Sequence, residues 1–466
     1  MVAYCPKFIR SFIILVIALA VPLDLLAAGM FIAPRGVRPL SRGGAFIAGA
    51  EDVHALTYNP AGLGFAKNEV MLDFGLPLHS TDYTRLLADS GEHLPTVRGE
   101  GLGIPSPTIA GVYAYEPWGL TFGGGLFADY PLLQNWPSRL DDGSPSPQRY
   151  AIVNYTGTAV VRLAAGVGYS PVDWLSVGFA IQGFTGRFVS ETTLSNCDGV
   201  VCSAPEDEMF DAAIQFESDP FVTPGIQAGL IVVPTDWLRL GLSWESGYHV
   251  EAGGVLRGRL ADDEIFDNAH LEPAEPHAVS RYNLPMSVRA GLEVRGEGGW
   301  RVEGAFVWEQ WSVHDILELD PESTFIEDVT MIGSYELGRV EIERSFRDTW
   351  SARLGTEVAL GDLGVGDMTL RGGILYEPSA IAPEKLTAMA VDLDKVVTSI
   401  GLGWQLDDIR MDLLYAFVFM PTLEVDESDV RQASAARPPW EGRTTIGEGT
   451  YQSSAHIIGL GATLSF

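Results

Sequence analysis

The chain has 466 residues, of which 61 are acidic and 30 basic, and its formal net charge is −31 at pH 7. This balance excludes a nucleic-acid partner and argues against docking on anionic lipid head groups, because both carry phosphates that such a chain would repel. The acidic residues either keep exposed loops solvated, which is the favoured interpretation, or share divalent cations with lipopolysaccharide.

The N-terminus has the pattern of a secretory signal peptide. Lys7 and Arg10 precede an uncharged apolar run at 12–23, and small residues follow up to Ala28. The run is too short to span a hydrocarbon layer of about 30 Å, so it is not a membrane anchor. We predict that residues 1–28 are removed on export.

The segment 29–67 is rich in Gly and Ala and has no sustained strand pattern. Its moderate hydrophobicity and few charges argue against a disordered tail. We therefore predict an ordered segment that packs against the rest of the chain, 68–466.

From residue 68 onward the main signal is period-two alternation in segments of about ten residues. In the last segment, for example, Ile458, Leu460 and Phe466 share one face, and Gly459 and Gly461 share the other. We predict fourteen strands, at 68–77, 107–116, 119–128, 150–170, 174–189, 221–233, 237–247, 284–296, 300–312, 348–360, 367–377, 395–405, 409–420 and 453–466.

The gaps between these strands alternate between long and short, as in outer-membrane barrels, which have long external loops and short periplasmic turns. Four tryptophans fall at or just after short turns, which is typical of an aromatic girdle at the membrane boundary: Trp118, Trp174, Trp237 and Trp300. The predicted fold is all-β, a 14-stranded antiparallel transmembrane β-barrel whose lumen holds segment 29–67 as a plug.

Two of the long loops contain candidate site residues. Cys197 and Cys202 lie close together and predict a disulfide, which suits an oxidising compartment; a metal site would need further ligands. Leu132, Leu133 and Trp136 form an apolar group that is a candidate site for the entrance of hydrophobic ligands. The alternative is that Trp136 only packs against its own loop.

Charged residues alternate with apolar ones on several strands and are expected to face the lumen. Either one of these arginines holds a ligand carboxylate, or the charges pair with each other and pin the plug. The second interpretation is favoured, and no ligand role is assigned to this set, which comprises Arg289, Glu293, Arg295, Arg301, Glu303, Arg353, Glu357 and Arg371.

The run Gly43-Gly44-Ala45-Phe46-Ile47-Ala48 leads to Asn59-Pro60-Ala61-Gly62-Leu63. This combination resembles the N-terminal hatch of the FadL-type family of outer-membrane transporters, and the resemblance extends over 284–420 and the last strand. It implies a barrel plugged by a hatch. It also implies hydrophobic ligands, such as long-chain fatty acids or aromatic hydrocarbons, captured at the external loops. The terminal Phe466 matches the residue by which the barrel-assembly machinery recognises such chains.

Within the hatch, 43–63 is the predicted gate. The Asn59 side chain is expected to bond to backbone about two residues on, Pro60 to keep Asn59 extended, and Gly62 to permit a conformation closed to larger residues. Ala61 and its small neighbours leave room for movement. The alternative is that the motif only anchors the plug.

The predicted function is passive, ligand-gated transport of hydrophobic molecules across the Gram-negative outer membrane, by a protein that is expected to be a monomer. The alternatives are a general diffusion porin, and a surface adhesion or structural barrel. The sequence has no Gly-x-Ser-x-Gly elbow and no His spacing typical of a metal site, so neither an enzyme nor a cofactor is predicted.

Overall fold

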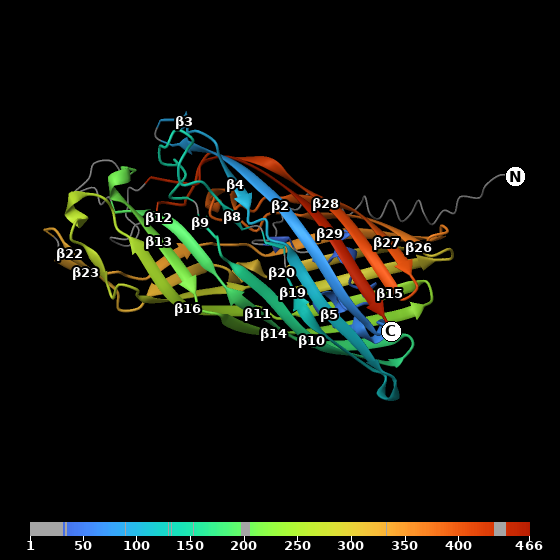
Figure 1. The fold of residues 1–466 in the computed structure, drawn as a ribbon. Helices are drawn as coiled ribbons and strands as arrows, with labels where there is room; N and C mark the ends of the chain where they lie inside the picture. Colours follow the sequence, from blue (N-terminus) through green and yellow to red (C-terminus); the bar gives the residue numbers. More distant parts are fainter. Residues whose placement is uncertain are drawn as a thin grey trace.

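A computed structural model describes residues 31–32, 35–88, 90–128, 130–131, 133–151, 153–196, 206–331, 333–432 and 444–466. Strands dominate the described chain, and the only helices are short turns (Figure 1). None of these helices has the length and hydropathy needed to cross a membrane. The predicted signal peptide, Leu132 and both loop cysteines lie outside the described residues, so their roles stay predictions.

Fourteen antiparallel strands form a closed barrel, which confirms the predicted fold class. Each pairs with the next along the chain, and β2 closes the barrel on β29 over seventeen register pairs, from Glu69–Ser465 to Arg85–Gly449. The strands are β2 (Glu69–Leu87), β5 (Ser106–Tyr115), β6 (Leu120–Phe127), β10 (Ala159–Val172), β11 (Leu175–Arg187), β14 (Phe221–Thr235), β15 (Leu238–Glu245), β19 (Ser287–Gly296), β20 (Trp300–Glu309), β25 (Thr349–Asp362), β26 (Asp367–Glu377), β27 (Lys395–Leu406), β28 (Ile409–Val425) and β29 (Gly449–Ser465).

Alternation along each strand separates a lumen face from an apolar outer face. On β2, Val70, Leu72 and Phe74 are exposed, whereas Met71 and Asp73 are buried. The same pattern recurs around the barrel, so a continuous outer band of large apolar side chains needs a hydrocarbon environment.

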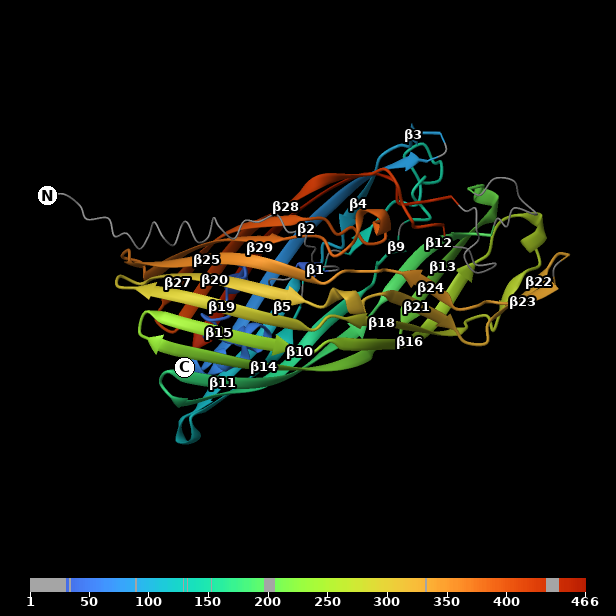
Figure 2. The same ribbon diagram turned by 180° about the vertical axis from the view of Figure 1, so that it is seen from behind.

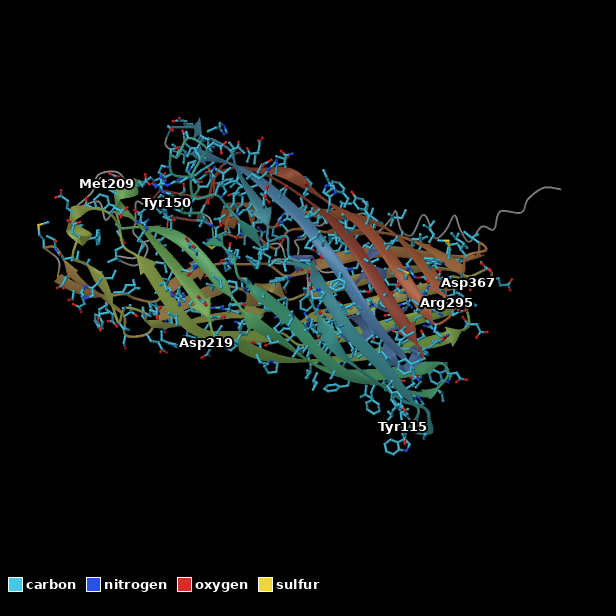
Figure 3. All side chains as sticks on the ribbon, in the orientation of Figure 1. Tyr115, Tyr150, Met209, Asp219, Arg295 and Asp367 are labelled. Atoms are coloured by element: carbon cyan, nitrogen blue, oxygen red, sulfur yellow. The ribbon has the colours of Figure 1, made fainter. Side chains whose placement is uncertain are left out.

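The two ends of the barrel differ as the loop lengths predict. Trp118, Trp174, Trp237 and Trp300 are all exposed and lie at the short turns. Tyr115 marks this end in Figure 3, and Met209 marks the opposite end, where the long loops gather.

The prediction of a continuous strand at 150–170 is wrong at its start, because β10 begins only at Ala159. The preceding residues turn into the loops instead. Arg149 donates to a carboxylate oxygen of Asp211 at 2.5 Å, and the Tyr150 hydroxyl donates to the other oxygen of that carboxylate. These buried polar contacts hold the segment away from the wall.

The long loops, for which no strands were predicted, contain sheets of their own (Figure 2). A seven-stranded sheet extends from the rim, with its strands in the order β24 (Val340–Glu343), β21 (Ile316–Pro321), β18 (His277–Leu284), β16 (Tyr248–Arg259), β13 (Asp211–Ser218), β12 (Val189–Ser195) and β9 (Val153–Asn154). Beyond it, β17 (His270–Glu272), β22 (Phe325–Val329) and β23 (Gly333–Glu336) form a small second sheet. The buried-exposed alternation of β16 shows that this strand had a detectable signal.

Near the rim, the wall beside β2 changes from one strand to another. β2 pairs with β5 as far as Gly75 and with β4 (Val97–Gly101) from Ser80. The chain after β6 leaves the wall: β7 (Tyr130–Pro131) pairs with β1 (Phe31–Ile32), and β8 (Gln134–Asn135) then pairs with β4. At the tip of β2, its last residues pair with β3 (Glu92–His93).

The closed ring of strands and the exposed Phe466 that follows β29 both concern assembly of the barrel. We expect the folded protein to be heat-modifiable, so that unheated and boiled samples migrate differently in detergent gels, because barrel strands are joined by a closed ring of hydrogen bonds. Deleting Phe466 should lower the yield of the folded form in the outer membrane several-fold, whereas Phe466→Tyr should not. Recovery of the intact protein from the soluble periplasm would refute the membrane barrel.

Candidate functional site

The described part of the N-terminal segment lies inside the barrel. It contains α2 (Val37–Leu40), α3 (Ala55–Tyr58) and η1 (Pro60–Phe65), and the residues at 36–50 and 52–63 are all buried. We call residues 35–66 the hatch. The helix α2 packs on β27, β28, β29 and β2, whereas η1 packs on β6, β10, β11 and β14, so the hatch reaches across the lumen.

Inward-facing glycines let the hatch backbone touch the wall. A methyl group on Gly178 would lie 2.1 Å from the carbonyl carbon of Pro60, and one on Gly373 would lie 2.1 Å from the nitrogen of Gly43. Contacts with the hatch backbone occur on seven barrel strands, at Gly168, Gly178, Gly229, Gly241, Gly291, Gly355 and Gly373. Any larger side chain at these places would overlap the hatch, so the high glycine content has a structural use.

A single wall carboxylate binds the small-residue run of the hatch. Glu303 on β20 is fully buried and accepts hydrogen bonds from three consecutive backbone N–H groups, those of Ile47 (2.6 Å), Ala48 (2.8 Å) and Gly49 (3.0 Å). The guanidinium of Arg42 lies 3.3 Å from Glu303 and donates to Glu293 at 2.7 Å. Charge-assisted hydrogen bonds of this kind are strong, and those to Glu303 fix residues 47–49 of the hatch against the wall.

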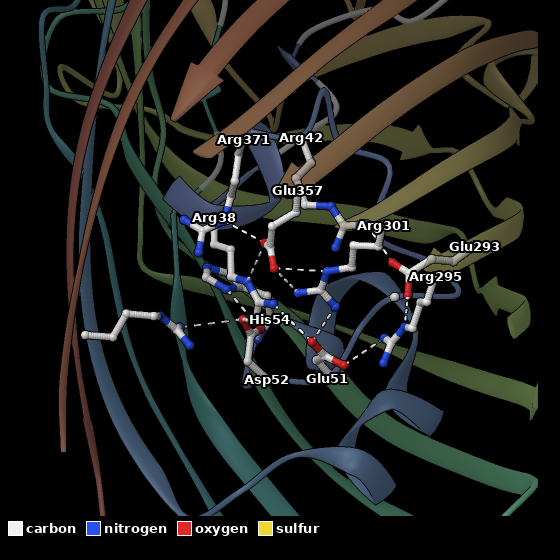
Figure 4. A network of polar contacts seen from close by, with 12 residues as sticks. Arg38, Arg42, Glu51, Asp52, His54, Glu293, Arg295, Arg301, Glu357 and Arg371 are labelled. Carbon is white, nitrogen blue, oxygen red and sulfur yellow. Dashed lines mark hydrogen bonds and ion pairs between the residues drawn. The ribbon is translucent and has the colours of Figure 1, made fainter. Parts of the chain in front are cut away.

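A second charge network joins the hatch to the wall at Glu51 and Arg38 (Figure 4). Glu51 lies 2.9 Å from Arg295 and also pairs with Arg239 and Arg301, all three on wall strands. Arg38 contacts Glu51, Asp52 and the wall carboxylate of Glu357, at 3.1, 2.8 and 3.6 Å. Each hatch charge therefore has several partners of opposite sign.

His54 connects the two helical parts of the hatch to β2. Its ring nitrogens lie 3.3 Å from Asp52 and 3.1 Å from Asp73. The same Asp73 carboxylate accepts a hydrogen bond from the backbone N–H of Val37 at 3.0 Å, at the start of α2. One wall carboxylate thus positions both helices.

The Asn59 motif has the predicted geometry with one difference. The Asn59 backbone is extended, and its side-chain oxygen accepts from the N–H of Ala61 at 3.2 Å. Its amide nitrogen donates to the carbonyls of Ile47 (2.9 Å) and, on the wall, Leu230 (3.2 Å). Gly62 does not have a left-handed backbone; it is needed for space, because a methyl group there would lie 2.5 Å from the Ala50 carbonyl oxygen.

The predicted lumen charges contact each other and the hatch, as the favoured interpretation required. Arg289 pairs with Glu245, Arg371 with Glu357, and Arg353 donates to the Gly44 carbonyl. Strand alternation predicted the inward direction of these charges but not the glycine contacts, although each such glycine also falls at an inward-facing position of its strand. Among the described residues, no three His, Cys, Asp or Glu side chains are placed to hold a metal ion.

On the loop side of the hatch, the lumen is filled by one large group of buried apolar side chains. We call it the apolar cluster; it runs from Val37 and Leu40 in the hatch to Trp136, Trp311 and Phe346 near the loops. Trp136 is 4% exposed and packs on the backbone of Gly99. Leu133 is half-buried, so Leu133 and Trp136 do not form an open surface group.

The glycine contacts predict that small changes in the wall displace the hatch. Gly178→Ala should destabilise hatch packing by about 1–3 kcal/mol, because the added methyl overlaps Pro60. We expect a lower melting temperature and faster proteolysis within the hatch. Gly304→Ala is the matched control, since a methyl at Gly304 on β20 meets nothing within 4 Å. Identical behaviour of the two variants would contradict the close contact.

The chain matches known proteins in sequence pattern and in fold. The model of the family described as outer membrane protein transport protein (OMPP1/FadL/TodX) matches residues 24–466. No match was found among curated proteins.

Three solved structures illustrate the shared fold. A Pseudomonas aeruginosa FadL homologue superposes with a TM-score of 0.74 at 16% identity, covering 94% of this chain and all of the other. The Ralstonia pickettii toluene transporter TbuX gives 0.62 at 15% identity, covering 93% and 99%. The P. putida toluene transporter TodX gives 0.61 at 16% identity, covering 95% and 99%.

The family match covers the hatch and the whole barrel, and it confirms the resemblance drawn from the sequence. Members of this family are transport proteins of the outer membrane and not enzymes. The chain therefore belongs to the OMPP1/FadL/TodX family of outer-membrane transport proteins.

Proposed function

We propose that this protein carries hydrophobic molecules across the outer membrane by passive diffusion, with the hatch as its gate. The observation that carries the proposal is the apolar cluster, which occupies the lumen directly outside the hatch. Transfer of an apolar solute from water to this region is favourable, and the free energy released is proportional to the apolar area removed from water. Long-chain fatty acids and aromatic hydrocarbons are the two candidate ligand classes.

The alternative of a general diffusion porin is less well supported. An open porin has a polar, water-filled lumen, whereas here hatch and apolar cluster lie in series along the barrel axis. A surface adhesion or structural barrel would use the acidic loop sheets and would not need a hatch. Neither alternative accounts for the number of wall positions that accommodate the hatch backbone.

The hatch contacts suit a segment that shifts without losing its charge partners. Glu51 has three arginine partners on the wall, and Arg38 has one carboxylate partner on the wall and two within the hatch. Removing a buried ion from its only partner costs several kcal/mol, but exchange among several partners avoids most of this cost. We infer that residues 43–63 move as the gate while these charges exchange partners.

The entrance of the ligand is proposed near Trp136. This residue follows the place where the chain leaves the wall after β6, and β7 in the same stretch pairs with β1 at the start of the N-terminal segment. A ligand that displaces Trp136 from Gly99 would reach the apolar cluster directly. The β1–β7 pairing gives such a displacement a mechanical connection to the hatch.

Transport and conductance measurements separate the candidate functions. Liposomes that contain the purified protein should take up labelled oleate or toluene faster than empty liposomes. The same preparation in planar bilayers should lack a large, steady conductance, because the hatch fills the lumen. A steady open channel would instead indicate a porin. No uptake, together with lost surface binding on deletion of the protein, would indicate an adhesion protein.

A disulfide tether tests the movement of the gate. The Cγ of Leu56 in α3 lies 3.4 Å from a Cβ built on Gly123 in β6. In a disulfide, the sulfur of one cysteine lies about 3 Å from the Cβ of the other, so a disulfide fits between these two positions. The variant Leu56→Cys/Gly123→Cys should fold, take up ligand slowly when oxidised, and recover on reduction.

The reduced form of the same double variant is the matched control for this tether. It carries the same loss of the Leu56 side chain and differs only in the covalent bond. If the oxidised form takes up ligand at the rate of the reduced form, residues 43–63 are an anchor and not a gate.

A further inference from the structure

The loop that joins β26 to β27 packs into the apolar cluster, and its only regular element is the short turn η6 (Pro383–Lys385). We call residues 378–394 the inner loop. Its stretches 378–382, 386–388 and 391–393 are buried. Six of its apolar residues belong to the apolar cluster and are at most 6% exposed: Ala380, Ile381, Leu386, Ala388, Val391 and Leu393. The inner loop therefore fills part of the region that is proposed to receive the ligand.

The two ends of the inner loop are fixed to each other. A carboxylate oxygen of Asp392 accepts a hydrogen bond from the backbone N–H of Ala380 at 2.6 Å, and Asp394 accepts one from the N–H of Ser379 at 2.8 Å. Asp392 also pairs with Lys395, the first residue of β27. A loop whose ends are joined in this way is a compact unit on a narrow neck.

Between these ends, the inner loop has few polar contacts with the rest of the protein. In the part of the chain that the structure describes, residues 380–391 form hydrogen bonds with other loops but with neither the hatch nor a barrel strand. The N–H of Arg347 donates to the carbonyl of Ala380 at 2.9 Å, and the Tyr155 hydroxyl donates to that of Met389 at 3.3 Å. Apolar contacts thus hold this segment in place, and a hydrophobic ligand in the same position replaces them at little cost.

The tip of the inner loop lies outside the apolar cluster and carries a cation. Nζ of Lys385 lies 3.2 Å from a carboxylate oxygen of Glu343 in β24 and 3.6 Å from one of Asp429, which follows β28. The carbonyl of Glu384 accepts a hydrogen bond from the N–H of Asp429 at 2.8 Å. Ion pairs this close to solvent contribute little to stability, so Lys385 is a weak latch between the inner loop and its two neighbours.

We propose that the inner loop is an internal substitute for the ligand. Its apolar side chains occupy the ligand's place in the apolar cluster, and a ligand enters by displacing the loop outward about its neck, which releases the Lys385 latch. The inference rests on the proposed function and adds to it a second movable element, on the loop side of the same site.

The lysine content of the chain provides a specific test. The sequence has four lysines, at positions 7, 67, 385 and 395. Lys395 is 1% exposed, and Lys67 precedes β2 at the end of the barrel with the short turns. A carbodiimide, which takes up the water released, joins an amine to an adjacent carboxylate as an amide. On the loop side of the described chain it therefore ties Lys385 to Glu343 or Asp429, and peptide mass spectrometry identifies the product.

Uptake of labelled oleate and labelled toluene is measured with the full-length protein in liposomes, before and after this treatment. The treated protein should transport at about one fifth of the untreated rate or less, because the closed loop keeps the ligand's place filled. Lys385→Arg is the matched control: it keeps the charge but has no amine, so treatment should change its rate by less than about twofold.

Movement of the inner loop is measured separately from transport. Ala388→Cys should react with a water-soluble maleimide several times faster when oleate or toluene is added, and the amide link should abolish this increase. The parent chain corrects for reaction at Cys197 and Cys202, and the heat-dependent gel shift confirms that each sample is folded.

Three results decide between the outcomes. Undiminished uptake by the linked protein, or an equal decrease in treated Lys385→Arg, would overturn the inference and leave the proposed function intact. The same holds if both probes are taken up while labelling of Ala388→Cys stays constant. An untreated protein that takes up neither probe would refute the proposed function itself, and the inference with it.

Discussion

The hatch backbone can reach the barrel wall only where the wall has no side chain. At Gly178, Gly355 and Gly373 the separation leaves no room even for a methyl group, and glycines that meet the hatch backbone lie on seven strands. Because the hatch is short and has few regular hydrogen bonds of its own, this close contact replaces the packing that a longer helix would provide. It also brings the charged residues of the hatch within reach of the charged residues of the wall.

Once the backbone is that close, buried polar groups must find partners within the protein, since an unsatisfied group there costs free energy. Glu303 meets this need for three consecutive N–H groups, and Asp73 does so at the start of α2. The hatch charges Arg38, Arg42 and Glu51 are in turn neutralised by wall residues. The lumen charges thus serve primarily to hold the hatch, which leaves the apolar cluster as the part of the lumen suited to a hydrophobic ligand.

The outer half of the lumen is built differently from the hatch region. There, loop sheets and the ends of β2 and β28 enclose aromatic and aliphatic side chains. Buried ion pairs also occur there, such as Arg149 with Asp211 and Lys395 with Asp392, but they join wall and loop segments and do not involve the hatch.

The sequence by itself determined the barrel: alternation, loop lengths and the tryptophans at short turns predicted all fourteen wall strands, with an error at the start of β10. Strand alternation is a local property, so it can be read from neighbouring residues. It also identified the Asn59 turn, whose hydrogen bond spans only two residues. The sequence could not show that Gly178 meets Pro60 or that Glu303 binds Ile47. Those relations join residues more than a hundred positions apart, and only closure of the barrel around the hatch decided them.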